Sequence, residues 1–165
     1  MPFNPNNVVV RTTGQSMWTT LTDLHYLGPE GDWLVPAGFV TDFASIPTFV
    51  TWLIPKHGQH TLAAILHDWL IAHPVVPPRD TDRIFRRVLG ELGVPPVRRA
   101  LMWAGVRAAA ILNPSRRAQW WRDFPAVAAI SLLALPIVAP ASILAIAGVA
   151  AYKAAERVAA AAGQK

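Results

Sequence analysis

The sequence predicts an α+β fold: a small N-terminal β-meander packed with about four helices, followed by a C-terminal hydrophobic helical segment that forms a kinked span or a helical hairpin. Three observations predict it. Short strand-like runs occupy residues 8–41, helical patterns fill residues 45–113, and residues 124–152 carry no charged side chain. We therefore expect a domain over 1–113, an Arg- and Trp-rich collar over 114–123, and an apolar helical segment over 124–162.

The strands of the meander are predicted from short runs rich in β-branched and aromatic residues, which glycine and proline interrupt. Gly14, Gly28-Pro29 and Gly31 supply the turn signals. The expected strands cover residues 8–11, 17–20, 23–27, 33–35 and 39–41.

Four helices are expected to follow the meander. They run from Ser45 to just before Pro55, from Thr61 to Ala72, from Asp80 or Asp82 to Gly93, and from Pro95 to Asn113. Ser45 has a side-chain oxygen that can cap the first of them. The second is apolar nearly all round, and a helix without a polar face is expected to be buried.

The composition narrows the class of protein. Of the 165 residues 53% are hydrophobic and only 15% are charged, and the mean hydropathy is +0.31. Ordinary soluble domains carry about 25% charged residues, so this chain is unusually apolar. Disorder requires low hydrophobicity and high net charge, so this composition excludes a disordered chain. The absence of cysteine excludes disulfides, a thiol nucleophile and thiolate metal sites.

The uncharged run over 124–152 is long enough to cross a bilayer, because a span needs about 20 predominantly apolar residues. Aromatic and basic residues flank it, as is typical of membrane–water interfaces. The residues expected at the interface are Trp120, Trp121 and Arg122 at one end and Tyr152 and Lys153 at the other.

Two prolines, Pro136 and Pro140, interrupt this run, and each removes a helical N–H group. The run is therefore expected to hinge there, either as one kinked span or as two helices over 126–135 and 141–162. An alternative is that the segment lies buried as a helix pair in a multi-subunit complex.

The net charge of +5 is concentrated in one stretch. Residues 1–78 sum to −3, residues 79–122 to +7 and residues 123–165 to +1. Basic residues can contact phosphates of nucleic acid or of anionic lipid headgroups. Because the sequence carries no recognisable DNA-binding motif and the basic stretch adjoins the apolar run, we expect lipid rather than nucleic acid.

Three ionisable residues interrupt apolar context and are the candidate catalytic residues: Asp42, His67 and Asp68. Burial of such groups is costly unless they are paired, so we expect Asp42 to pair with His67. In one hypothesis His67 is a general base that a carboxylate orients. In a second, a metal is bound by residues among Asp42, His60, His67 and Asp82. In a third, the group is a structural hydrogen-bond network. No cofactor is expected.

Two blocks of this sequence, VPAGFVTDFASIP (35–47) and AAILHDWL (63–70), resemble those of a bacteriophage and bacterial family, domain of unknown function 1353. The stretch DRIF (82–85), Gly93-Val94 and Arg107 are also similar to its later blocks. The resemblance covers about residues 8–112. It implies a phage or prophage product, in many genomes encoded near tail or lysis genes, and implies no activity or catalytic residue.

Taken together, these features predict a bacteriophage virion component, a minor tail or tail-tip protein whose C-terminal segment engages the host membrane or packs in the tail. Its expected partners are other tail proteins and host membrane lipids. Residues 1–10 show no secretory signal. One alternative is a membrane-anchored His- or metal-dependent hydrolase that acts on cell wall or lipid. Another is a holin-like small membrane protein made during infection.

Overall fold

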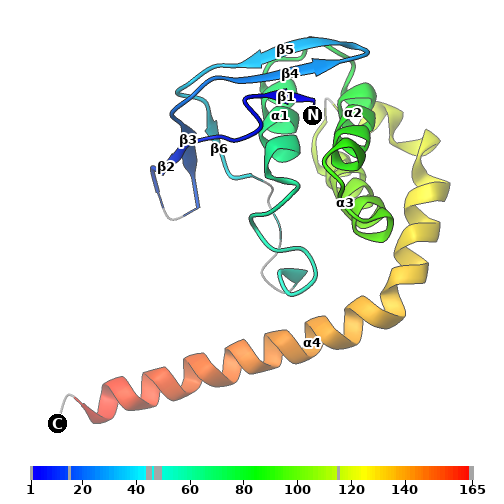
Figure 1. The fold of residues 1–165 in the computed structure, drawn as a ribbon. Helices are drawn as coiled ribbons and strands as arrows, with labels where there is room; N and C mark the ends of the chain where they lie inside the picture. Colours follow the sequence, from blue (N-terminus) through cyan, green and yellow to red (C-terminus); the bar gives the residue numbers. More distant parts are fainter. Residues whose placement is uncertain (1, 15, 44–45, 47–49, 115, 164–165) are drawn as a thin grey trace.

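The structure is a computed structural model that describes residues 2–14, 16–43, 46, 50–114 and 116–163. Figure 1 shows two small antiparallel sheets, three helices beneath one of them, and a long fourth helix that leaves the domain. The predicted α+β class is confirmed, and so is the apolar helix at the C-terminal end.

The first sheet has the strand order β1-β4-β5, formed by Phe3–Asn4, Leu24–Gly28 and Gly31–Val35. The second has the order β2-β3-β6, formed by Val10–Thr12, Trp18–Thr20 and Val40–Thr41. The predicted single meander is therefore divided between two sheets. β1 was not predicted, since its two residues show no alternating pattern.

The β4–β5 hairpin shows why the first sheet faces the core. Its register pairs Leu24 with Val35 and Tyr26 with Trp33, and all four side chains are buried. Because alternate residues of a strand share one face, this pattern gives the sheet one apolar side. The first two of the three helices lie beneath that side in Figure 1, and the third packs against the second.

Helix α1 (Thr61–Ala72) has the bounds that its apolar pattern predicted, and it is buried along most of its length. α2 (Pro78–Glu91) and α3 (Pro96–Ala109) each begin at a proline, which suits a first helical turn. Gly93, with φ of +77°, follows α2 in the left-handed conformation that favours glycine. α2 packs between α1 and α3.

The helix expected after Ser45 depends on Ser45 and Pro47, which lie outside the described residues. Farther along, the Ile54 N–H group donates to the Val50 carbonyl oxygen at 3.0 Å, within a turn that precedes α1.

The collar contains a short 3-10 helix (Arg117–Arg122), and α4 (Phe124–Ala162) follows as one continuous helix. Pro136 and Pro140 lie inside α4, and Figure 1 shows the helix bending between its yellow and orange parts. Loss of two N–H donors and ring clashes with the preceding turn explain the bend. The predicted kink is confirmed, and a hairpin of two helices is not formed.

The beginning and middle of α4 contact the domain, and its distal part does not. Val127 is buried against Trp103 and Ala104 of α3. Beyond the bend, Ser142 is buried and its Oγ accepts a hydrogen bond of 3.4 Å from Trp52 Nε1. Residues 146–162 are exposed.

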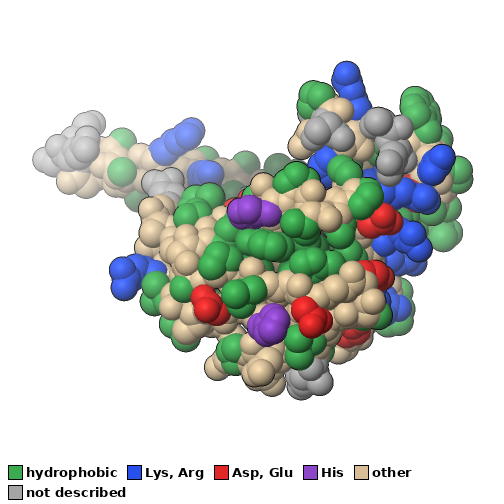
Figure 2. Space-filling view, turned by 90° about the horizontal axis from the view of Figure 1, so that it is seen from above, with side chains coloured by type: hydrophobic (Ala, Val, Ile, Leu, Met, Phe, Trp, Pro, Cys, Tyr) green, Lys and Arg blue, Asp and Glu red, His purple; other side chains and the backbone are tan. Residues whose placement is uncertain are grey.

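Charged side chains are unevenly distributed over the surface. Figure 2 shows Lys and Arg gathered at the side of the domain where α2 and α3 lie, with acidic side chains between them. Hydrophobic side chains occupy much of the central face in the same view. The basic stretch of the sequence thus becomes one side of the folded domain.

Candidate functional site

A cavity of about 490 Å³ is lined by residues of α1, α3 and α4 and by residues 42, 43, 46, 50, 53 and 54. Most of its lining is apolar, and the aliphatic lining residues include Ile46, Val50, Leu53, Ile71, Leu101 and Val106. Among the described residues, four polar ones also line it: Asp42, His67, Asp68 and Arg116. The cavity therefore combines an apolar wall with a small number of ionisable groups, as ligand sites commonly do.

His67 is positioned by a carboxylate from the neighbouring helix. Its Nε2 atom lies 2.8 Å from Asp82 Oδ1, and the two side chains are 6% and 0% exposed. The Phe85 ring packs on the imidazole with ring centroids 4.7 Å apart. An ionised carboxylate only accepts hydrogen bonds, so Nε2 carries the proton and Nδ1 is left as the basic nitrogen.

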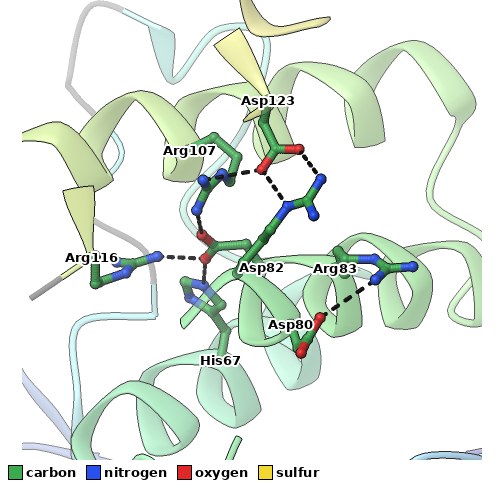
Figure 3. A network of polar contacts seen from close by, with 8 residues as sticks. His67, Asp80, Asp82, Arg83, Arg107, Arg116 and Asp123 are labelled. Carbon is green, nitrogen blue, oxygen red and sulfur yellow. Dashed lines mark hydrogen bonds and ion pairs between the residues drawn. The ribbon is translucent and has the colours of Figure 1, made fainter. Parts of the chain in front are cut away.

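The carboxyl group of Asp82 is paired with two arginines. Arg107 Nη1 donates to its Oδ2 at 2.8 Å, and Arg116 Nη2 donates to its Oδ1 at 2.5 Å (Figure 3). A buried charge is tolerated only when it is paired and hydrogen-bonded, and here both carboxylate oxygens have partners. The His67–Asp82 pair is thus fixed in orientation.

The same network continues into the collar. Asp123 accepts hydrogen bonds from Arg79 Nη2 at 2.9 Å and from Arg79 Nε at 3.1 Å, and it forms an ion pair with Arg107 at 3.1 Å. The Arg79 hydrogen bonds are the main reason why the pKa of Asp123 is lowered. Figure 3 shows that these residues come from α2, α3 and the segment that precedes α4.

Asp68, the next residue after His67, is tied to the strand that precedes the cavity. The Thr41 hydroxyl donates to Asp68 Oδ2 at 2.5 Å and accepts the Phe43 N–H group at 2.9 Å. Phe43 has φ of +67°, a conformation that costs about 1–3 kcal/mol in a non-glycine residue. Such strain is concentrated at functional sites, and this residue lines the cavity.

Burial raises the pKa of Asp68 to about 6, against the opposing effects of the Thr41 hydrogen bond and of His67. The negative charge of Asp42 raises it further. Asp68 Oδ1 lies 4.0 Å from His67 Nδ1. A carboxyl group that exchanges its proton near neutral pH therefore lies beside a basic imidazole nitrogen, which is the arrangement that general acid–base chemistry requires.

In the structure, the carboxylate that contacts His67 Nε2 is not the one that the sequence favoured. We expected Asp42 to orient it, but its Nε2 pairs with Asp82, which the sequence named only as a possible metal ligand. Asp42 and Asp68 share the cavity with His67. The difference arises because α1 packs against α2, and no local pattern reports that register.

The metal hypothesis finds no support among the described residues, which contain no group of three His, Asp or Glu side chains placed to hold an ion. His60 lies at the N-terminal end of α1 and is buried, and it is not among the described residues that line the cavity. Burial, followed by the charge of Arg98, lowers the pKa of His60.

Five polar residues of the site were not selected as site candidates from the sequence: Thr41, Arg79, Arg107, Arg116 and Asp123. A signal existed for Arg107, which lies within an otherwise apolar run and is fully buried. Arg116 belongs to the Arg- and Trp-rich collar, and its side chain forms an ion pair with Asp82.

The residues predicted for the membrane interface are placed near the beginning of α4 and far along it. Trp120 packs against Trp121 and Phe124, with ring centroids 5.1 and 4.8 Å apart. Trp121 and Arg122 are exposed, as are Tyr152 and Lys153 near the distal part of α4. α4 is the one helix among the described residues that is long and apolar enough to cross a membrane, a judgement from length and composition.

A model of the family described as "Protein of unknown function (DUF1353)" matches residues 18–106. Searches of the curated proteins and of the solved structures found no significant match to the chain. The matched region contains Thr41, His67 and Asp82, so residues that build the cavity and its buried ion pairs lie within it. With more than half of its length matched, the chain belongs to the DUF1353 family.

Proposed function

We propose that the protein is a bacteriophage virion component, a minor tail or tail-tip protein, that engages the host membrane through α4. The observation that carries this proposal is the exposure of α4. Leu133 and Leu144 are 79% and 72% exposed, within a run of 29 residues without a charge. Monomeric soluble proteins rarely leave so large an apolar surface in water, and lipid or partner subunits are the surfaces that cover one.

Lipid is favoured over a protein partner by the residues at the ends of the run. Exposed Trp121 and Arg122 lie before it, and exposed Tyr152 and Lys153 lie at its far end. Aromatic side chains next to basic ones suit the headgroup region, where an amphipathic ring meets both lipid and water. At a rise of 1.5 Å per residue the run measures about 43 Å, longer than the hydrocarbon core of about 30 Å.

Vesicle flotation tests this proposal. The full chain is expected to float with vesicles, and the double variant Ile137→Asp with Ile143→Asp is expected to lose flotation. Each charge near the bilayer centre costs about 2.5–3.5 kcal/mol. The matched control carries Val75→Asp and Val97→Asp at exposed positions of the domain, and it should float like the wild type.

Equal flotation of the wild type and the α4 variant, or no flotation of either, would contradict the membrane role. Mass spectrometry of purified phage particles tests the assignment to the virion. Absence of the protein from particles, together with its presence in infected-cell membranes, would favour the holin-like alternative.

A second candidate function, a membrane-anchored hydrolase acting on cell wall or lipid, is favoured by the geometry of His67. In that reaction His67 Nδ1 takes a proton from water and the resulting hydroxide attacks the substrate carbonyl carbon. The bond from that carbon to the leaving group then breaks, and protonated Asp68 gives its proton to the leaving group. Asp82, which Arg107 and Arg116 hold in place, fixes the orientation and the tautomer of the His67 ring.

The test of this second candidate is hydrolysis of ester lipids and of cell-wall fragments by the full chain. His67→Ala and Asp68→Asn are each expected to lower the rate by about 10²–10⁴-fold while the fold is retained. Asp80→Asn changes a carboxyl on the outer side of α2 and should leave the rate unchanged. Hydrolysis that persists in His67→Ala would exclude the assignment.

A further inference from the structure

We propose that the 490 Å³ cavity binds the acyl chain of a neutral ester lipid, with the chain against the apolar wall and the ester carbonyl beside His67 and Asp68. This proposal deepens the hydrolase candidate, because it names the substrate class of that site. It depends on the membrane role only for the source of the lipid.

The size of the cavity fits a ligand site. A volume of about 490 Å³ lies in the range of small-molecule sites, about 300–1,000 Å³. An apolar cavity gains little from water, which needs two to four polar partners, so an apolar ligand is the favoured occupant.

The wall of the cavity selects for a flexible hydrocarbon. Aliphatic side chains from three parts of the fold supply most of it: Ile46 and Leu53 before α1, Ile71 in α1, and Leu101 and Val106 in α3. Burial of apolar surface is favourable by about 25 cal/mol per Å² and is non-directional, so such a wall suits an acyl chain.

The polar residues select against an anionic head. Asp42 and Asp68 both line the cavity, and Arg116 is already paired with Asp82 at 2.5 Å. A ligand carboxylate there would meet two carboxyl groups without a free cation among the described lining residues. An ester carbonyl carries no charge, so neither protonation state of Asp68 repels it, and below about pH 6 it can also accept a hydrogen bond from protonated Asp68.

The position of α4 indicates where the ligand comes from. Val138 of α4 lines the cavity, and four residues later Ser142 accepts a hydrogen bond from Trp52, which precedes the lining residue Leu53. The helix proposed to enter the membrane is therefore also a wall of the cavity. A lipid chain that follows α4 out of the bilayer reaches the cavity without crossing water.

Photolabelling of the full chain in detergent, with a long-chain methyl ester that carries a diazirine, tests the proposal. Trypsin cuts after Arg and Lys and so separates α1 (peptide 57–79), the middle of α3 (peptide 100–107) and the apolar part of α4 (peptide 123–153). We expect label in all three peptides of the wild type. The α4 label reports general apolar contact, and the α1 label reports occupancy of the cavity.

Gly105→Leu is the decisive variant. Gly105 lines the cavity, and a Cβ atom built there meets no atom within 4 Å, so a leucine is accommodated without a clash and is expected to narrow the cavity. The label on peptide 57–79 should fall at least tenfold, while the label on peptide 123–153 stays unchanged. Gly148→Leu, at an exposed position of α4 with equally open surroundings, should change the α1 label less than twofold.

Equal α1 label in the wild type and in Gly105→Leu would overturn the proposal. Labelling of α4 alone in the wild type would also overturn the proposal. The corresponding free fatty acid at pH 8 should label peptide 57–79 at least tenfold less than the ester, and equal labelling would overturn the neutral head group. The labelling is done in detergent and therefore does not depend on binding to vesicles. If the protein fails to float with vesicles but α1 is still labelled, the membrane role is contradicted and the cavity proposal is not.

Discussion

At the scale of single residues, the buried carboxylate of Asp82 is the centre of the site. It is fully buried and contacts His67, Arg107 and Arg116. Three arginines, Arg79, Arg107 and Arg116, oppose two carboxylates, those of Asp82 and Asp123, so each carboxylate of the network contacts two cations. Such a group is stable only while every member is present, because a single charge left alone in the interior is costly.

Asp82→Ala is therefore expected to lower the free energy of unfolding by about 3–5 kcal/mol, since it leaves buried Arg107 without its main partner. Urea unfolding followed by circular dichroism measures this. Asp80→Ala is the matched control on the same helix: its partner Arg83 is exposed and 3.4 Å away, so the expected loss is below about 1 kcal/mol. Equal losses in the two variants would contradict the central role of Asp82.

Asp68 gives a prediction about pH. Its pKa rises from 3.8 in the unfolded chain to about 6 in the folded one, because burial disfavours the carboxylate. The folded state thus holds this proton more tightly, so the contribution of Asp68 to stability is present below about pH 4 and is lost as the pH rises to about 6. The loss is about 3 kcal/mol at most.

Asp68→Asn removes this titration and keeps an oxygen that can accept the Thr41 hydrogen bond. The unfolding free energy of the wild type minus that of Asp68→Asn should decrease as the pH rises from 4 to 7, and it should stay constant at higher pH. Urea titrations at one-unit steps measure it. A difference that is independent of pH would show that the Asp68 carboxyl is solvated in the folded protein.

At the scale of elements, the collar joins the domain to α4. The sequence predicts a domain boundary at residue 113, yet Arg116 pairs with Asp82 and Asp123 pairs with Arg79 and Arg107. Farther on, Val127 of α4 is buried against α3. These contacts connect the collar to the buried part of the domain by ion pairs and by packing.

Two truncated chains test what these contacts contribute. A chain ending at residue 131 keeps the collar and Val127, and one ending at residue 113 has neither. Both are expected to unfold cooperatively in urea, with the shorter chain less stable by about 3 kcal/mol, because Arg107 and Asp82 lose partners. Equal midpoints would mean that the domain is energetically complete at residue 113.

Several elements follow from local patterns. α1 begins and ends where its apolar run does, α3 begins at its proline, and the bend of α4 lies at Pro136 and Pro140. Each depends on residues close together in the chain, through burial, backbone geometry or a missing N–H group. β1 was not predicted because it is defined by its pairing with β4, in which Phe3 lies opposite Tyr26. The two residues of β1 show no strand pattern of their own.

At the scale of the whole molecule, the fold redistributes the charge that the sequence concentrates. Between residues 79 and 122, the described residues Arg79, Arg83, Arg87, Arg107 and Arg116 form ion pairs with acidic side chains of the same chain. Arg86 lies over the Trp103 ring. Much of the positive charge of this stretch is thus paired within the protein.

The sequence by itself determined the class of fold and the apolar helix at the C-terminal end, and it singled out residues 42, 67 and 68, which the structure places around one cavity. These follow from composition and short-range periodicity, which report burial and backbone preference. Only the tertiary structure decided that Asp82 orients His67 and that Arg107, 25 residues farther along, holds Asp82. The physical reason is that such pairs depend on the register between packed helices, and a carboxylate in the sequence carries no information about which helix its partner occupies.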